Sequence, residues 1–221
     1  MTSPRHPVEL PSREQPRDYY DFDRYISPQR MLTYWHQIRE VMTRKPARVL
    51  EVGVGTGLVA SYLRASGIDV TTFDINEALE PDVVGSVLDL GSLVPAGAFD
   101  LVLCARVLHH LPYEQLPEAL ANLAAVTRKH LVLTLPVEDF SISFSVRRTA
   151  GPQHTFRLPL PIGVKRALFW KGSRSGLWKI DDGPEHRLGA VTGVIGRHFD
   201  VDRGFRLPED PAHQVFTCSV K

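Results

Sequence analysis

The sequence contains few cysteines and no long apolar run. Cys104 and Cys218 are the only cysteines among 221 residues, which is too few for a disulfide framework, and they show no zinc-binding spacing. No apolar stretch approaches the roughly 20 residues that a membrane-spanning helix needs. Residues 1–16 are polar and proline-containing and lack the apolar core of a secretory signal. We therefore expect a cytoplasmic protein without a membrane span.

The sequence also lacks an excess of charge of one sign. Lys and Arg number 26 and Asp and Glu number 25, so the formal net charge is +1. Nucleic-acid-binding proteins usually carry a clear basic excess because phosphate contacts dominate their affinity, so no nucleic-acid partner is expected. Residues 141–180 are a local exception, with basic residues and no acidic ones. Two interpretations stay open for them: attraction of an anionic group or an ordinary solvated surface.

The order of the predicted elements indicates a single α/β domain. Ser27 and Pro28 are typical of a helix start, and apolar residues continue at helical spacing to about residue 44. From Arg48 onward, short apolar runs alternate with helical segments, which is typical of a parallel sheet covered on both faces. We expect strands at 49–52, 69–73, 82–88, 99–104, 130–135, 201–207 and 214–220, and helices at 57–65, 116–126 and 187–197.

The chain is predicted to divide into two parts. Residues 1–45 form an N-terminal arm and a helix, and residues 46–221 form the main domain. Within the main domain, residues 140–185 break the alternation of strands and helices and contain Pro, Gly and aromatic residues. We expect this segment to be a late insertion.

The most informative segment is the glycine-rich turn that follows the first predicted strand. Gly53, Gly55 and Gly57 stand at alternate positions, and Glu51 precedes the first of them by two residues. Glycines permit positive φ and close approach of a ligand. The helix that follows offers free N–H groups and the positive end of its dipole. A tight turn without a ligand is the alternative, and the spacing G-x-G-x-G differs from the dinucleotide pattern G-x-G-x-x-G.

This segment resembles motif I of the class I S-adenosylmethionine-dependent methyltransferases, in which a hydrophobic strand and an acid precede G-x-G-x-G. The resemblance continues in order and spacing over residues 48–136. It implies a doubly wound, Rossmann-like seven-stranded sheet with an antiparallel last strand. It also implies an N-terminal helical arm, an insertion on the substrate side, and S-adenosylmethionine as the cofactor.

The resemblance also implies roles for individual residues. Glu51 would face the methionine end of the cofactor, and Asp74 would bind the ribose hydroxyls, since a carboxylate can accept two hydrogen bonds. Ser86 stands where many family members have Asp, so the backbone of Val87 or the nearby Asp89 could contact the adenine instead. The predicted cofactor-binding residues are Glu51, Gly53, Gly55, Gly57, Asp74, Ile75, Ser86, Val87, Asp89 and Cys104. In the arm, Tyr19, Tyr20, Tyr25 and Arg30 are expected to cover the cofactor as a lid.

Candidates for the catalytic groups follow the fourth and fifth strands. Methyl transfer from a sulfonium is an in-line displacement, in which the protein mainly aligns the reactants and excludes water. A hydroxyl acceptor also needs a base for its proton. His109 is the preferred base, and His154 and Asp139 are further candidates, whereas His110 can equally be structural. Some quinone O-methyltransferases carry metal-binding acids at the positions of Arg106 and His109, so no metal site is predicted here.

The expected activity is methylation of an oxygen atom on a small hydroxylated metabolite or a saccharide. Methylation of a small amine is the nearest alternative. A non-catalytic cofactor-binding protein would bind the cofactor without turnover, and an RNA or protein methyltransferase would have a broad basic surface. The Asn/Asp-Pro-Pro-Tyr signature of base-amino methylation is absent after the fourth strand. The acceptor and the oligomeric state stay open.

Overall fold

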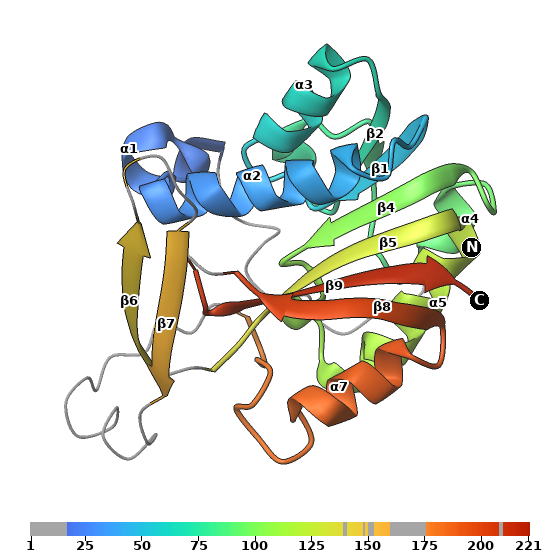
Figure 1. The fold of residues 1–221 in the computed structure, drawn as a ribbon. Helices are drawn as coiled ribbons and strands as arrows, with labels where there is room; N and C mark the ends of the chain where they lie inside the picture. Colours follow the sequence, from blue (N-terminus) through green and yellow to red (C-terminus); the bar gives the residue numbers. More distant parts are fainter. Residues whose placement is uncertain (1–16, 139–140, 148, 150–152, 160–175, 208–209) are drawn as a thin grey trace.

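Seven strands form one sheet in the computed structural model, which describes residues 17–138, 141–147, 149, 153–159, 176–207 and 210–221. The strand order is β3-β2-β1-β4-β5-β9-β8 (Figure 1). Strands β1 to β5 run parallel, whereas β9 is antiparallel to both of its neighbours. This confirms the predicted seven-stranded Rossmann-like sheet with an antiparallel last strand. The strands are β1 Arg48–Val52, β2 Asp69–Asp74, β3 Val83–Val84, β4 Phe99–Ala105, β5 Thr127–Pro136, β8 Phe199–Arg206 and β9 His213–Val220.

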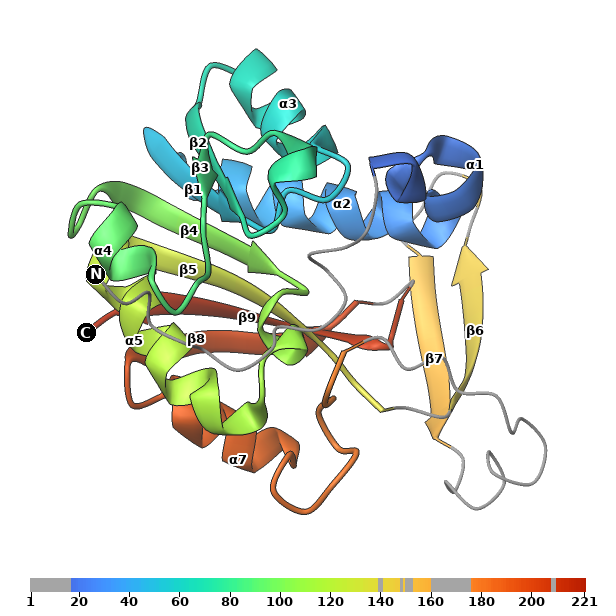
Figure 2. The ribbon, with the colours of Figure 1, turned by 180° about the vertical axis from the view of Figure 1, so that it is seen from behind.

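Helices cover both faces of the sheet (Figures 1 and 2). Successive residues of β4 show why: Leu101 and Leu103 pack into one apolar cluster, and Val102 and Cys104 into the other. Alternate residues of a strand point to opposite faces of the sheet, and all four side chains are fully buried because helices cover both faces. The first cluster lies under α2 (Pro28–Met42) and α3 (Leu58–Ala65), and the second under α4 (Leu90–Leu93), α5 (Leu116–Val126) and α7 (Leu188–Ile195). Among the described residues, no helix has the length and apolar character that a membrane span requires.

Helix α2 begins where the sequence predicts and joins the arm to the main domain. The Ser27 hydroxyl accepts a hydrogen bond from the Arg30 N–H at 3.2 Å, and Pro28 occupies the first helical position. Val41 near the end of α2 is fully buried in the cluster it shares with α3 and the sheet. The boundary expected at residue 45 falls in the connection between α2 and β1.

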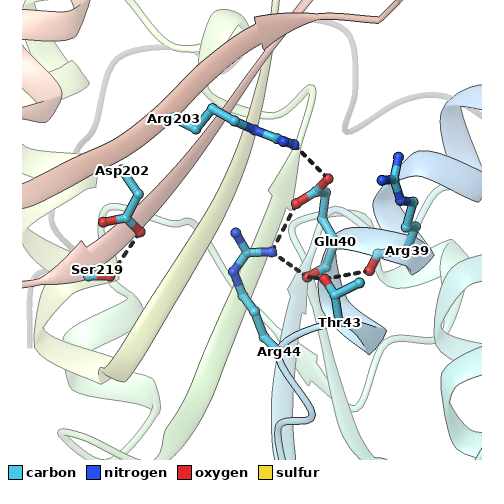
Figure 3. Close-up of polar contacts among 7 residues, drawn as sticks. All are labelled: Arg39, Glu40, Thr43, Arg44, Asp202, Arg203 and Ser219. Atoms are coloured by element: carbon cyan, nitrogen blue, oxygen red, sulfur yellow. Dashed lines mark hydrogen bonds and ion pairs between the residues drawn. The ribbon is translucent and has the colours of Figure 1, made fainter.

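A polar network ties the end of α2 to the edge strand β8 (Figure 3). The buried carboxylate of Glu40 accepts hydrogen bonds from Arg44 Nη1 at 2.9 Å and from Arg203 Nη2 at 3.0 Å. Arg203 lies on β8, so Glu40 connects the helix on one face of the sheet to its outermost strand.

Replacing Glu40 with alanine is expected to lower the free energy of unfolding by about 2 kcal/mol, because hydrogen bonds to charged groups are lost near the core. Urea denaturation measures this change. Asp202→Ala is the matched control, since Asp202 is exposed and accepts a hydrogen bond from Ser219 of β9 (Figure 3), and it should cost less than about 0.5 kcal/mol. Equal destabilisation by the two substitutions would show that the Glu40 network does not stabilise the fold.

The third strand is shorter than predicted. The sequence predicts one strand over 82–88, but β3 comprises only Val83–Val84. The chain leaves the sheet at Gly85, where a Cβ would lie 2.3 Å from Leu93 Cδ1, and the Ser86 hydroxyl then accepts a hydrogen bond from the Leu88 N–H at 3.1 Å. These contacts start the turn into α4.

The expected insertion contains two strands that the sequence analysis did not predict. Strands β6 (Ser141–Arg147) and β7 (Gln153–Pro159) form a separate antiparallel hairpin beyond the end of β5 (Figures 1 and 2). Phe144 pairs with Phe156, and both side chains are exposed. Apolar residues alternate with serines in β6, which is the ordinary strand pattern.

Candidate active site

A cavity of about 320 Å³ lies at the carboxyl ends of β1, β2 and β4. The chain runs outward from β1 to β3 and then crosses back to β4, so β1 and β4 diverge at the point where ligands bind in open parallel sheets. The walls come from the β1–α3 turn, the first half of α2, the segment before α2 and the loop after β4.

The glycine turn adopts backbone conformations that other residues rarely tolerate. Gly53, Gly55 and Gly57 have φ values of +90°, +54° and +70°. A Cβ on Gly53 would lie 2.4 Å from Val107 Cγ2, so the turn and the loop after β4 are in close contact. Gly53 and Gly55 line the cavity, whereas Gly57 lies at the N-cap of α3 behind the turn.

Glu51 on β1 places a buried carboxyl group on the cavity wall. Its side chain is almost fully buried, and Oε2 has no hydrogen-bond partner among the described residues. Burial raises the pKa of Glu51 to about 8, against a smaller opposing effect of a backbone hydrogen bond. A cationic ligand in contact with Oε2 would favour the ionised form.

Asp74 ends β2 and faces the same cavity. Its Oδ2 accepts a hydrogen bond from the Val54 N–H at 2.8 Å, and its Oδ1 accepts one from the Asn76 N–H at 2.9 Å. Burial raises the pKa of Asp74, and the backbone hydrogen bonds partly oppose this shift. A carboxylate has about four acceptor sites, so the group keeps acceptor capacity for ligand hydroxyls in the cavity.

The structure brings most of the predicted cofactor-binding residues together. Those that line the cavity are Glu51, Gly53, Gly55, Asp74, Ile75 and Val87. Those that do not are Gly57, Ser86, Asp89 and Cys104. Ser86 and Cys104 are buried, and Asp89 stands at the N-terminal end of α4. The cavity therefore combines the glycine turn with two carboxyl groups.

The two adjacent histidines after β4 have different surroundings. They lie on the short 3₁₀-helix η4 (Leu108–His110), and His110 lines the cavity. The ring of His109 is fully buried against that of His110, with centroids 4.0 Å apart. A Cβ on Gly176 would lie 2.2 Å from His109 Cδ2, so the returning chain covers His109. The structure thus brings His110, and not the preferred candidate His109, to the cavity.

The imidazole of His110 is neutral near pH 7. Burial, together with the positive charge of Arg106, lowers its pKa to about 4. The pKa of His109 also lies well below its ordinary value, chiefly because of burial. His154 lies on β7 opposite Val146, and Asp139 lies outside the described residues.

The N-terminal arm contributes aromatic residues to the cavity, as the sequence analysis expects. Tyr19, Tyr20 and Tyr25 line it and contact one another, with the Tyr20 and Tyr25 ring centroids 4.8 Å apart. The guanidinium of Arg30 lies 3.7 Å from the centroid of the Tyr25 ring.

Apart from Arg30, which was expected near the cofactor, sequence reasoning missed the polar face that α2 presents to the cavity, and it missed Arg106 as a cavity residue. Arg30, Thr33, Tyr34 and Gln37 recur at helical spacing and line the cavity. Polar residues at this helical spacing are the signal that could have identified them. Thr33 and Gln37 are buried, whereas the apolar side chains of Leu32 and Trp35 elsewhere on α2 are exposed. Within the described ranges, no group of three or more His, Cys, Asp or Glu side chains could hold a metal ion.

Comparisons with known proteins agree with this geometry. A family model described as "Methyltransferase domain" matches residues 23–160. The chain is 26% identical over 194 residues to the ubiquinone biosynthesis O-methyltransferase of Coxiella burnetii, covering 82% of this chain and 80% of that protein. It is 30% identical over 151 residues to the chloroplastic magnesium protoporphyrin IX methyltransferase of Arabidopsis thaliana. That match covers 58% of this chain and 48% of the plant protein, so it spans about half the plant protein's length.

Solved structures show the same fold. Magnesium protoporphyrin IX methyltransferase from Synechocystis PCC 6803 with bound S-adenosylhomocysteine superposes with a TM-score of 0.62 at 16% identity, covering 93% of this chain and 98% of that one. The N-methyltransferase NodS from Bradyrhizobium japonicum WM9 superposes with a TM-score of 0.56 at 14% identity, covering 88% of each chain. With the family match, the strand order and the glycine turn, these results identify the chain as a member of the class I S-adenosylmethionine-dependent methyltransferase family.

Proposed function

We propose that this protein transfers the methyl group of S-adenosylmethionine to a hydroxyl oxygen of a small molecule, and that His110 accepts the proton of that hydroxyl. The observation that carries the oxygen acceptor is the position of His110 on the wall of the cavity, where a ring nitrogen can accept the proton of a hydroxyl. The similarity to an O-methyltransferase over most of both chains supports the same choice.

The residues of the cavity fit the cofactor. The unpaired Oε2 of Glu51 suits the ammonium of the methionine end, and Asp74 suits the two ribose hydroxyls. The positive φ of Gly53 and its missing Cβ allow the turn to pack against Val107 and form the cavity wall on which the ligand would lie. When bound, the cofactor supplies a methyl group activated by a sulfonium.

The protein's own residues then align and protect the reactants. His110 holds a ring nitrogen ready for the hydroxyl proton while the oxygen–carbon bond forms and the carbon–sulfur bond breaks, which leaves a neutral thioether. The aromatic rings of Tyr19, Tyr20 and Tyr25 cover one side of the cavity and exclude water.

Replacing His110 with alanine is expected to lower kcat by at least about 100-fold, the usual contribution of a general base, and to leave S-adenosylhomocysteine affinity within about 2-fold. Because the neutral imidazole is the active form, kcat of the unsubstituted protein should stay level above pH 6 and fall as the pH drops through about 4. His198→Ala is the control, since His198 does not line the cavity.

The acceptor atom is tested with S-adenosylmethionine labelled in its methyl group and a panel of phenols, hydroxy acids and primary amines. We expect label on oxygen. Label on nitrogen alone would make the protein an N-methyltransferase. Cofactor binding without turnover on any acceptor would favour a non-catalytic role.

A further inference from the structure

Two arginines line the cavity, and no ion pair joins either of them to another described residue. Arg30 comes from the first turn of α2, and Arg106 directly follows β4. The Nε of each is buried and has no hydrogen-bond partner among the described residues. A buried donor on a charged group is costly unless it is paired, so both guanidinium groups are suited to bind anions from a ligand.

The proposed cofactor brings only one carboxylate to the cavity. Its ammonium is assigned to Glu51 and its ribose to Asp74, so a single negative charge is left for two arginines. The two arginines come from different elements of the fold. Arg30 belongs to α2, with its guanidinium 3.7 Å from the centroid of the Tyr25 ring, whereas Arg106 lies four residues before His110 in the loop after β4, and both of these line the cavity. Arg106 is therefore the arginine on the side of the proposed acceptor.

The backbone of Arg106 supports a role for its side chain. Arg106 has a φ of +60°, a conformation that costs a non-glycine residue about 1–2 kcal/mol. Its N–H donates to the Thr134 carbonyl at 2.9 Å, which holds the strained residue at the end of β4. A glycine would adopt this conformation without strain, so the local backbone does not explain the arginine.

The carboxylate of Asp210 is held by residues other than Arg106. Arg106 contributes to the lowered pKa of Asp210, but the main partner of that carboxylate is His213, whose Nδ1 lies 2.7 Å from Oδ2. Thr33 Oγ1 also donates to Asp210, at 3.4 Å. In the described part of the chain, no ion pair joins Arg106 to Asp210.

We infer that the methyl acceptor is a small hydroxylated organic acid whose carboxylate is bound by Arg106, with its hydroxyl at His110. The planar guanidinium can bind a carboxylate through two parallel hydrogen bonds, which would fix the orientation of the acceptor as well as its position. This inference rests on the proposed function, because it places the acceptor beside His110.

The test compares acids with neutral counterparts on the protein saturated with S-adenosylhomocysteine. The probes are 4-hydroxybenzoate, 3,4-dihydroxybenzoate and 3-hydroxyphenylacetate, each paired with its primary amide, and binding is followed by ligand-observed NMR. We expect at least one acid to bind, and at least about 10-fold more tightly than its amide, as the loss of a charge-assisted hydrogen bond predicts. Arg106→Gln should abolish this difference, and Arg106→Lys should restore part of it.

Arg30→Gln is the matched control. It should weaken S-adenosylhomocysteine binding while the ratio between acid and amide is unchanged, and thermal unfolding shows whether each variant folds. If no acid is preferred, or if the preference survives Arg106→Gln in folded protein, the inference is wrong although the cofactor assignment stands. If S-adenosylhomocysteine itself does not bind, the proposed function fails first.

Discussion

Alanine in place of Gly53 is expected to weaken S-adenosylhomocysteine binding by at least about 30-fold, equivalent to about 2 kcal/mol. The φ of +90° is strained for alanine, at about 1–3 kcal/mol. The new Cβ would also lie 2.4 Å from Val107 Cγ2, and overpacking of this kind costs a further 1–3 kcal/mol or so. The turn must move to relieve the contact, which displaces Val54, whose N–H holds Oδ2 of Asp74 at the cavity. Isothermal titration calorimetry measures the loss.

Gly97→Ala is the control that distinguishes a general effect of backbone strain on stability from an effect on cofactor affinity at the site. Gly97 has a φ of +57°, nothing lies within 4 Å of an added Cβ, and the residue does not line the cavity. This substitution should lower stability by about 1 kcal/mol and leave cofactor affinity unchanged. Unchanged affinity in Gly53→Ala as well would show that the turn does not hold the cofactor.

Replacing Glu51 with glutamine is expected to stabilise the ligand-free protein at alkaline pH and to weaken cofactor binding. The pKa of Glu51 rises from its ordinary 4.5 to about 8 because the carboxyl is buried. Between these two values the folded protein keeps a proton that the unfolded chain releases, so the contribution of Glu51 to stability falls as the pH rises. Above pH 8 the folded protein bears the full cost of a buried charge, which glutamine avoids.

Two measurements follow for this variant. Urea denaturation should show Glu51→Gln more stable than the unsubstituted protein by about 2 kcal/mol at pH 8.5, with little difference at pH 5. Calorimetry at pH 7 in buffers of different ionisation enthalpy should show that S-adenosylhomocysteine binding releases a proton, because the ammonium favours the Glu51 carboxylate. Binding without proton release, or equal affinity in the variant, would remove Glu51 from the methionine end.

The sequence predicts the cofactor-binding residues because these residues lie on, or directly after, two successive strands. Glu51 lies on β1, Gly53 in the turn that follows it, and Asp74 at the end of β2. Their order along the chain therefore fixes their positions at the ends of neighbouring strands. The carboxyl ends of parallel strands meet at one edge, which brings such residues together without further information. These residues line the cavity as expected.

The acceptor side depends on details that spacing does not reveal. On a 3₁₀-helix, neighbouring residues point about 120° apart, so the choice between His109 and His110 is made by packing. The chain returning at Gly176 covers His109 and leaves His110 on the cavity wall. The spacing of residues does not predict the cavity position of Arg106 either, because that position depends on a positive φ that an arginine rarely adopts.

Tertiary contacts also determine the elements whose bounds were predicted differently or that were not predicted. Strand β3 ends after Val84, and Leu93 and Phe73 then lie so close to Gly85 that a Cβ there would clash, a contact between distant segments that the local pattern does not reveal. Strands β6 and β7 pair with each other outside the main sheet, so they do not follow its alternation of strands and helices.

Calorimetric titration with S-adenosylhomocysteine, with NAD as the comparison, tests the central claim most directly. The two ligands share an adenosine, but only the first has the amino acid end that Glu51 is proposed to hold, and only the second needs a pyrophosphate site. We predict tight one-to-one binding of S-adenosylhomocysteine and no binding of NAD. Binding of NAD, or no binding of S-adenosylhomocysteine to folded protein, would contradict the account.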